Sequence, residues 1–120
     1  MKLLIVDDSS AMRKTIERHL NGYDLDIVGT ANNGKEALEM LKTKNPDAVT
    51  LDITMPEMDG ITCLENMKKI KPEIKVMIIT ALSDKHTGLV AIDKGARGFL
   101  FKPVDPTDLA KAFDKLLERN

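Results

Sequence analysis

The sequence lacks the features that would tie a small protein together covalently or anchor it in a membrane. It has one cysteine, Cys63, so an internal disulfide bond is excluded. Its apolar runs reach only about five residues, far short of the ~20 that a membrane-spanning helix needs. The net charge of −1 gives no strong basic field for nucleic acid or a membrane surface. These absences favour a cytoplasmic protein that neither binds nucleic acid directly nor inserts into a membrane.

The chain does have enough length and apolar content to form one hydrophobic core. It contains 120 residues, of which 42% are hydrophobic. A chain of this size buries roughly two-thirds of the surface that its unfolded form exposes. We therefore expect a single domain over residues 1–120, which folds without a disulfide bond or a structural metal.

Short apolar runs alternate along the chain with stretches of helical periodicity. The runs are too short for helices, and all but the last are rich in β-branched residues, which indicates strands. The predicted strands are Leu3–Val6, Asp26–Gly29, Ala48–Leu51, Val76–Ile79 and Gly98–Phe101. Apolar residues between and after them recur at helical spacing and predict five helices. This alternation is typical of a doubly wound α/β fold, in which helices cover both faces of a five-stranded parallel sheet.

Capping residues support the helix boundaries. Ser9 or Ser10 precedes the first helix, Asp59 precedes the third, and Asp105 precedes a proline at the start of the fifth. The fourth helix, over roughly 84–94, is expected to be the weakest because Gly88 costs about 1 kcal/mol relative to alanine.

Reactive or metal-binding side chains lie at the ends of four of the predicted strands. Asp7 and Asp8 end the first strand, Asp52 the third, Thr80 the fourth and Lys102 the fifth. In an open parallel sheet, ligands bind outside the carboxyl ends of the strands. We therefore expect three carboxylates, a hydroxyl and an ammonium group to share one rim of the sheet.

Carboxylates that lie together on a rim need a cation between them. Two of them about 4 Å apart repel by roughly 4 kcal/mol at an effective dielectric constant of 20. Lys102 offers one positive charge, whereas Mg²⁺ offers two and prefers oxygen ligands. Asp7 and Asp8 thus have the chemistry of magnesium ligands. Asp52 is then available as a nucleophile that takes a phosphoryl group and forms an acyl phosphate.

Four motifs make the sequence similar to a known family. They are LIVDDSS at residues 4–10, VTLDITMPEMDG at 49–60, VMIITAL at 76–82 and FLFKPVDP at 99–106. With these motifs the chain resembles, over essentially its whole length, the receiver domain of two-component response regulators. The resemblance implies the CheY-like, flavodoxin-like (βα)5 fold.

The same resemblance implies a role for each residue of the rim. Asp52 would accept the phosphoryl group, and Lys102 would pair with it. Asp7, Asp8 and Asp52 would bind Mg²⁺ together with the backbone carbonyl of Thr54. A sensor histidine kinase or a phosphotransfer protein would donate the phosphoryl group. The protein would assist its own phosphorylation and dephosphorylation, but it would not be an enzyme with a separate substrate.

The resemblance also implies a conformational switch. The Thr80 hydroxyl would move toward the phosphoryl group, and Phe99 occupies the position of an aromatic ring that rotates. The surface of the fourth helix, fifth strand and fifth helix would then change and control a downstream partner, in chemotaxis or a phosphorelay. The peptide bond between Lys102 and Pro103 is often cis in this family. An apolar Leu82, two residues after Thr80, predicts a phosphoryl group that is not especially short-lived.

Two other classes of protein remain possible on the same fold. A Mg²⁺-dependent aspartyl phosphohydrolase usually carries a second acid two residues after the nucleophile, where this chain has Thr54. The other class is an interaction module that is not phosphorylated, or one that binds a flavin. A flavin site needs a phosphate-binding loop after the first strand, where this chain has Asp7 and Asp8.

Overall fold

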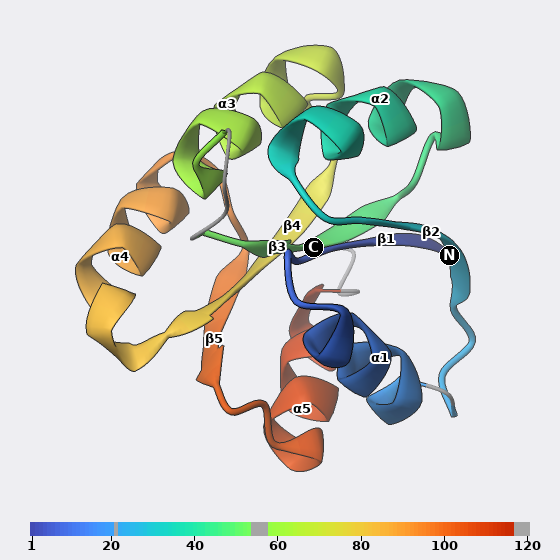
Figure 1. Ribbon diagram of the computed structural model, residues 1–120, viewed down its shortest axis with the longest axis vertical. Coiled ribbons are helices and arrows are strands. Elements are labelled where there is room, and N and C mark those ends of the chain that lie inside the picture. The colour runs from blue at the N-terminus through green and yellow to red at the C-terminus, as the bar shows by residue number, and fades with distance from the viewer. Residues whose placement is uncertain (21, 54–57, 117–120) are drawn as a thin grey trace.

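Five parallel strands form one sheet within the part of the chain that the computed structural model describes (Figure 1). That part comprises residues 1–20, 22–53 and 58–116, apart from the side chain of Leu82. The strand order is β2-β1-β3-β4-β5. The strands are β1 (Lys2–Val6), β2 (Asp26–Ala31), β3 (Ala48–Asp52), β4 (Lys75–Ala81) and β5 (Gly98–Lys102). All five predicted strands are confirmed, with ends extended by at most two residues where the ladder of backbone hydrogen bonds continues past the apolar run.

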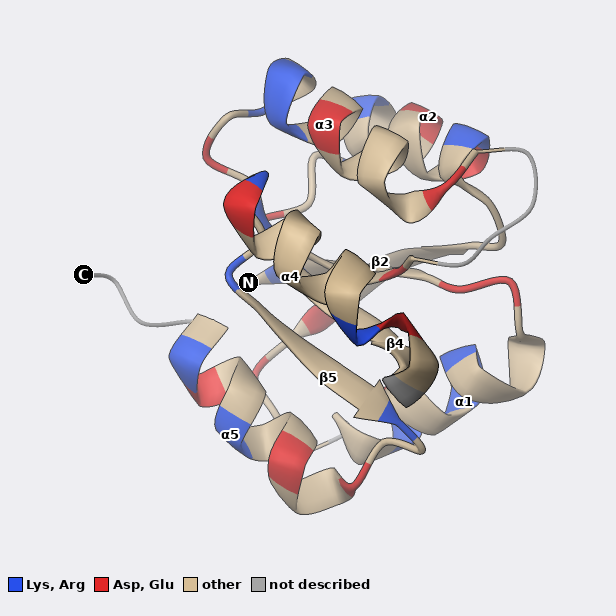
Figure 2. Ribbon diagram, turned by 90° about the vertical axis from the view of Figure 1, so that its left-hand side faces the viewer, with Lys and Arg blue, Asp and Glu red and all other residues tan. Residues whose placement is uncertain are grey.

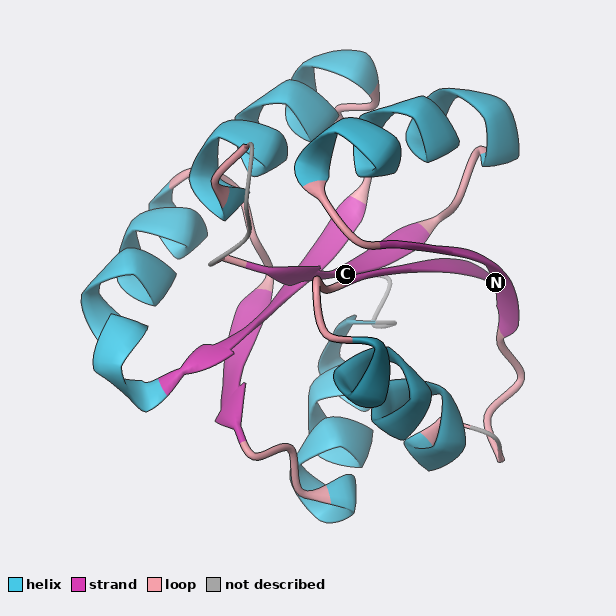
Figure 3. Cartoon of the chain, viewed as in Figure 1, coloured by secondary structure: helices cyan, strands magenta, loops and turns pink. Residues whose placement is uncertain are grey.

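Helices connect the strands in the predicted alternation (Figure 3). They are α1 (Ser10–His19), α2 (Gly34–Lys44), α3 (Gly60–Ile70), α4 (Lys85–Asp93) and α5 (Pro106–Leu116). A 3₁₀ turn over Leu82–Asp84 leads into α4. The predicted caps of α1 and α3 are confirmed. The side chain of Ser9, not Ser10, accepts a hydrogen bond from the Met12 N–H, and the side chain of Asp59 accepts one from the Thr62 N–H. None of the helices in the described ranges is long and apolar enough to cross a membrane.

The helices lie in two layers, one on each face of the sheet. In Figure 1, α1 and α5 lie on one side of the strands, and α2, α3 and α4 lie on the other. The α1–α5 side encloses a core that includes Ile16 and Phe113. The opposite side encloses a second core that includes Leu64 and Met67. Because alternate residues of a strand face opposite layers, this arrangement decides which rim residues can meet.

The outer strand β2 departs from regular pairing at one point. Its register against β1 shifts between Leu3 and Leu4, so that Val28 has no partner in the ladder. Such a bulge bends and twists an edge strand, which disfavours pairing with another chain. Strands β3, β4 and β5, which bring residues to the rim, pair with one another without a shift.

Candidate functional site

The carboxyl ends of β1, β3, β4 and β5 bring the predicted site residues to one rim of the sheet. Asp7 follows β1, Asp52 ends β3, and Lys102 ends β5 beside Ala81 of β4. Figure 2 shows acidic segments in the loop before α1 and at the start of α4, on the same side as the basic end of β5. Asp7 and Asp52 are buried, with 1% and 4% of their surface exposed, whereas Asp8 is exposed.

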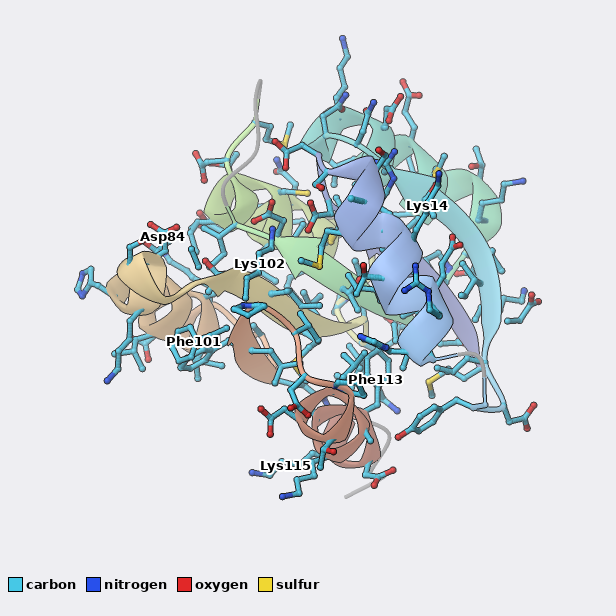
Figure 4. The ribbon with its side chains drawn as sticks, turned by 60° about the horizontal axis from the view of Figure 1, so that its bottom comes forward. Lys14, Asp84, Phe101, Lys102, Phe113 and Lys115 are labelled. Carbon is cyan, nitrogen blue, oxygen red and sulfur yellow. The ribbon has the colours of Figure 1, made fainter. Side chains whose placement is uncertain are left out.

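Lys102 joins the two buried carboxylates. Its Nζ lies 3.1 Å from Asp7 Oδ2 and 3.4 Å from Asp52 Oδ2. Figure 4 shows the side chain extending from the end of β5. Burial by itself would lower the pKa of the Lys102 ammonium, but the carboxylates of Asp52 and Asp7 outweigh it and hold the pKa above its ordinary value. Lys102 is therefore a fixed positive charge at neutral pH.

Three carboxylates remain close enough to share a metal ion. Oxygen atoms of Asp7, Asp8 and Asp52 lie within 4.8 Å of one another. The single charge of Lys102 leaves this group with an excess of negative charge, which a divalent cation would neutralise. Asp7 Oδ2 is also buried, and among the described residues the Lys102 ammonium at 3.1 Å is its partner, so it can still accept a metal ion. An oxygen-only donor set of three carboxylates with a net negative charge fits Mg²⁺.

Backbone and side-chain donors hold Asp7 in a defined orientation. The Ser9 N–H donates to Asp7 Oδ1 at 2.9 Å, and Arg13 Nη1 donates to the Asp7 carbonyl oxygen at 2.6 Å. The sequence did not indicate the role of Arg13, because its partner is a backbone atom. The only available signal was the position of Arg13 at the start of the helix that follows the acidic pair.

Thr80 and Phe99 lie on the other face of the sheet from Lys102. Phe99 packs against the core beneath α3 and α4, and strand alternation places Thr80 on the same face. The Thr80 hydroxyl is fully buried, and the described residues give it no hydrogen-bond partner. The Phe99 ring lies edge-on to that of Phe101, with 5.3 Å between centroids. Thr80 therefore has an unused donor. Its partner on β5 is Phe101, and Phe99 lies two residues before Phe101 on the same strand.

Two site predictions fall outside what the structure describes. Thr54, whose carbonyl was expected to bind Mg²⁺, is not among the described residues, and neither is the side chain of Leu82. The peptide bond between Lys102 and Pro103 is cis, as the resemblance implied.

Comparison with known proteins gives one consistent family. The model of the response regulator receiver domain family matches residues 3–114. The chemotaxis protein CheY of Bacillus subtilis is 39% identical over 116 residues, which is 97% of this chain and 97% of that protein. The chemotaxis protein CheY of Thermotoga maritima is 37% identical over 115 residues, 96% of each chain.

A solved structure agrees with these relatives. The CheX-CheY-BeF3-Mg²⁺ complex from Borrelia burgdorferi contains a chain that superposes on this one with a TM-score of 0.86 and 38% identity. The match covers 98% of this chain and 87% of that chain.

Proposed function

This chain belongs to the response regulator receiver domain family, and we propose that it is a signalling switch phosphorylated on Asp52. The observation that carries the proposal is the buried pair of Asp7 and Asp52 with the Lys102 ammonium held between them. A purely structural ion pair would need one carboxylate for one lysine. Here a second buried carboxylate and the exposed Asp8 are added at a strand end, which suits a charged ligand.

The reaction transfers a phosphoryl group from a histidine of a sensor kinase or phosphotransfer protein. An Asp52 oxygen forms a bond to phosphorus while the bond from phosphorus to the donor nitrogen breaks, and an acyl phosphate results. Asp7, Asp8 and Asp52 would hold Mg²⁺, with the Thr54 carbonyl as a further ligand. Bound Mg²⁺ would supply positive charge to the phosphoryl oxygens. Lys102 lies where its ammonium can pair with the same oxygens as they leave the donor.

The phosphoryl group also gives Thr80 the partner that it lacks. Its hydroxyl is buried without a described acceptor, so a new phosphoryl oxygen would draw it toward Asp52. Movement of Thr80 frees space on the face that it shares with Phe99, and the ring then has two alternative positions. A local change in charge thereby becomes a change in packing.

The surface that would respond is formed by α4, β5 and α5, which lie side by side in Figure 2. Leu89 and Ile92 of α4 are exposed, at 50% and 37%, and Phe101 of β5 is only partly buried. Apolar side chains at this surface suit a downstream partner protein. We place this switch in the cytoplasm, as one receiver domain over residues 1–120, and expect a role of the chemotaxis type.

The test is phosphorylation by a small donor. Purified protein is incubated with acetyl phosphate and MgCl₂, and its intact mass is measured beside Asp52→Asn and a sample that contains EDTA. We expect a gain of one phosphoryl group that requires Mg²⁺ and is lost in Asp52→Asn. A gain that persists in Asp52→Asn would move the acceptor elsewhere. No gain in any sample would favour an interaction module that is not phosphorylated.

A further inference from the structure

Asp7 is held through three of its four polar groups. Its backbone N–H donates to the Ala31 carbonyl of β2 at 3.0 Å, and its Oδ1 accepts from the Ser9 N–H. Its own carbonyl accepts from Arg13 at 2.6 Å. The remaining atom, Oδ2, is the one that faces Lys102 and the rim. The residue is therefore oriented before any ligand arrives.

Asp8 has no comparable support from side chains. It is exposed, and within the described ranges nothing donates a hydrogen bond to its carboxylate. Its direction is therefore decided by its backbone. The carbonyl of Asp7 and the amide of Asp8 belong to one planar peptide group, so a bond that fixes the carbonyl also fixes the plane from which Asp8 projects.

Arg13 is the side chain that fixes this plane. It is only partly exposed and lies near the beginning of α1, where the helix dipole gives a cation no advantage. A guanidinium is planar and holds its donors in fixed directions, which suits it to orient an acceptor. Its hydrogen bond to the Asp7 carbonyl connects α1 to the exact peptide that carries the two acidic residues.

We propose that Arg13 is a positioning residue for the magnesium site, acting through the peptide between Asp7 and Asp8. The inference rests on the proposed function, because it assigns Mg²⁺ to these carboxylates. Arg13 touches neither the metal nor the phosphoryl group in this assignment. It keeps Asp8 directed toward Asp7 and Asp52, so that the metal does not have to order the loop when it binds.

The sign of the effect separates positioning from simple electrostatics. Removal of a positive charge near three carboxylates should strengthen the binding of a cation. Loss of a group that orders the ligands should weaken it. Lys14 provides the matched control, because it is the next residue of α1, is exposed and carries the same charge (Figure 4).

The experiment measures the Kd of Mg²⁺ by calorimetric titration at constant ionic strength for wild type, Arg13→Gln, Arg13→Lys and Lys14→Gln. The urea midpoint of each protein in EDTA is measured in parallel. We expect Arg13→Gln to raise the Kd about tenfold, the low end of the effect of groups that support metal ligands. Arg13→Lys, which keeps a charged donor, should recover part of the affinity. Lys14→Gln should leave the Kd unchanged or slightly lower.

Three results would overturn the inference. A lower Kd in Arg13→Gln would mean that the residue acts by charge alone, and an unchanged Kd with an unchanged urea midpoint would mean that it does not support the site. A lower urea midpoint with an unchanged Kd would mean a structural role only. If Arg13→Gln does not fold, Arg13→Met decides in its place, because methionine keeps much of the apolar stem but has no donor for the Asp7 carbonyl. An unchanged or lower Kd in Arg13→Met contradicts positioning. Absence of Mg²⁺ binding in wild type would overturn the metal site of the proposed function as well, whereas the other results leave that function standing.

Discussion

Thr50 carries a buried hydroxyl that the proposed chemistry does not use. Only 1% of the residue is exposed, and among the described residues its Oγ1 has no hydrogen-bond partner. It lies in the central strand β3, paired with Ile5 on one side and Met77 on the other. A polar group in such a position has lost its hydration without a replacement, which makes the folded state less stable.

We expect Thr50→Val to raise the free energy of unfolding. Valine replaces the hydroxyl by a methyl group of similar volume, so the cost of the unpaired donor disappears, a gain of about 1 kcal/mol. Urea unfolding in metal-free buffer measures it. Thr50→Ser is the control, because it keeps the hydroxyl and removes the methyl group, and should lower stability. A loss of stability in Thr50→Val would show that the hydroxyl has a partner after all.

At the level of single residues, the sequence predicts the acidic and basic side chains of the rim better than it predicts their supports. Asp7 follows a strand and Asp52 and Lys102 end one, so the strand pattern is enough to place all three at the same rim of the sheet. Arg13 makes its bond to a carbonyl oxygen, and every residue has one of those. A side chain that acts on the backbone leaves no recognisable pair of residue types in the sequence.

At the level of elements, α3 depends on the cap that Asp59 provides. Asp59 Oδ1 accepts from the Thr62 N–H at 2.9 Å, and Oδ2 accepts from the Thr62 hydroxyl at 3.1 Å. The pKa of the Asp59 carboxyl is lowered from its ordinary value of 3.8, mainly because the backbone N–H of Thr62 donates a hydrogen bond to the carboxylate. The cap also marks the start of α3. The first residue of α3, Gly60, lies against the backbone of Ile53, and a Cβ at this position would clash with the Ile53 Cα.

We expect Asp59→Ala to lower the free energy of unfolding by about 1 kcal/mol at pH 7. Because the pKa is lower in the folded state, this stabilisation is fully present above pH 3.8 and is lost as the pH falls through the folded pKa. Urea unfolding of both proteins at pH 7, 5 and 3 measures the difference. Asp59→Asn keeps an acceptor without a titrating charge and serves as the control. A difference between wild type and Asp59→Ala that stays constant down to pH 3 would contradict the carboxylate cap.

Gly88 of α4 also contacts another element of the fold. The sequence suggested that this glycine only weakens α4, and α4 is indeed short, beginning after a 3₁₀ turn. The structure shows in addition that this position faces β5: a Cβ at Gly88 would lie 3.4 Å from the Phe99 ring, an ordinary van der Waals contact. The Phe99 ring therefore packs beside Gly88, a contact between elements that helical periodicity does not reveal.

For the whole molecule, the alternation of strands and helices predicts the fold class but leaves the strand order open. A right-handed crossover can place the next strand on either side of the last one, and the chain must reverse direction once to cover both faces. That reversal puts β1 and β3 in the middle of the sheet. Asp7 and Asp52 thereby become neighbours at the rim, although local pattern shows only that each follows a strand.

Since the fold alone brings these carboxylates together, Mg²⁺ should stabilise the folded protein. The unfolded chain separates Asp7 from Asp52 and has no comparable site, so stability rises with metal concentration, by about 2.7 kcal/mol at one hundred times the Kd. Urea unfolding in increasing MgCl₂ measures the gain, with NaCl at equal ionic strength as control and Asp8→Asn as the variant with a weakened site. NaCl should raise the free energy of unfolding less than MgCl₂ does, because it only screens the repulsion between the carboxylates. In Asp8→Asn the free energy of unfolding should rise less steeply with MgCl₂ concentration than in wild type. Equal gains in the two salts would mean that the rim is relieved by screening and does not bind a metal ion.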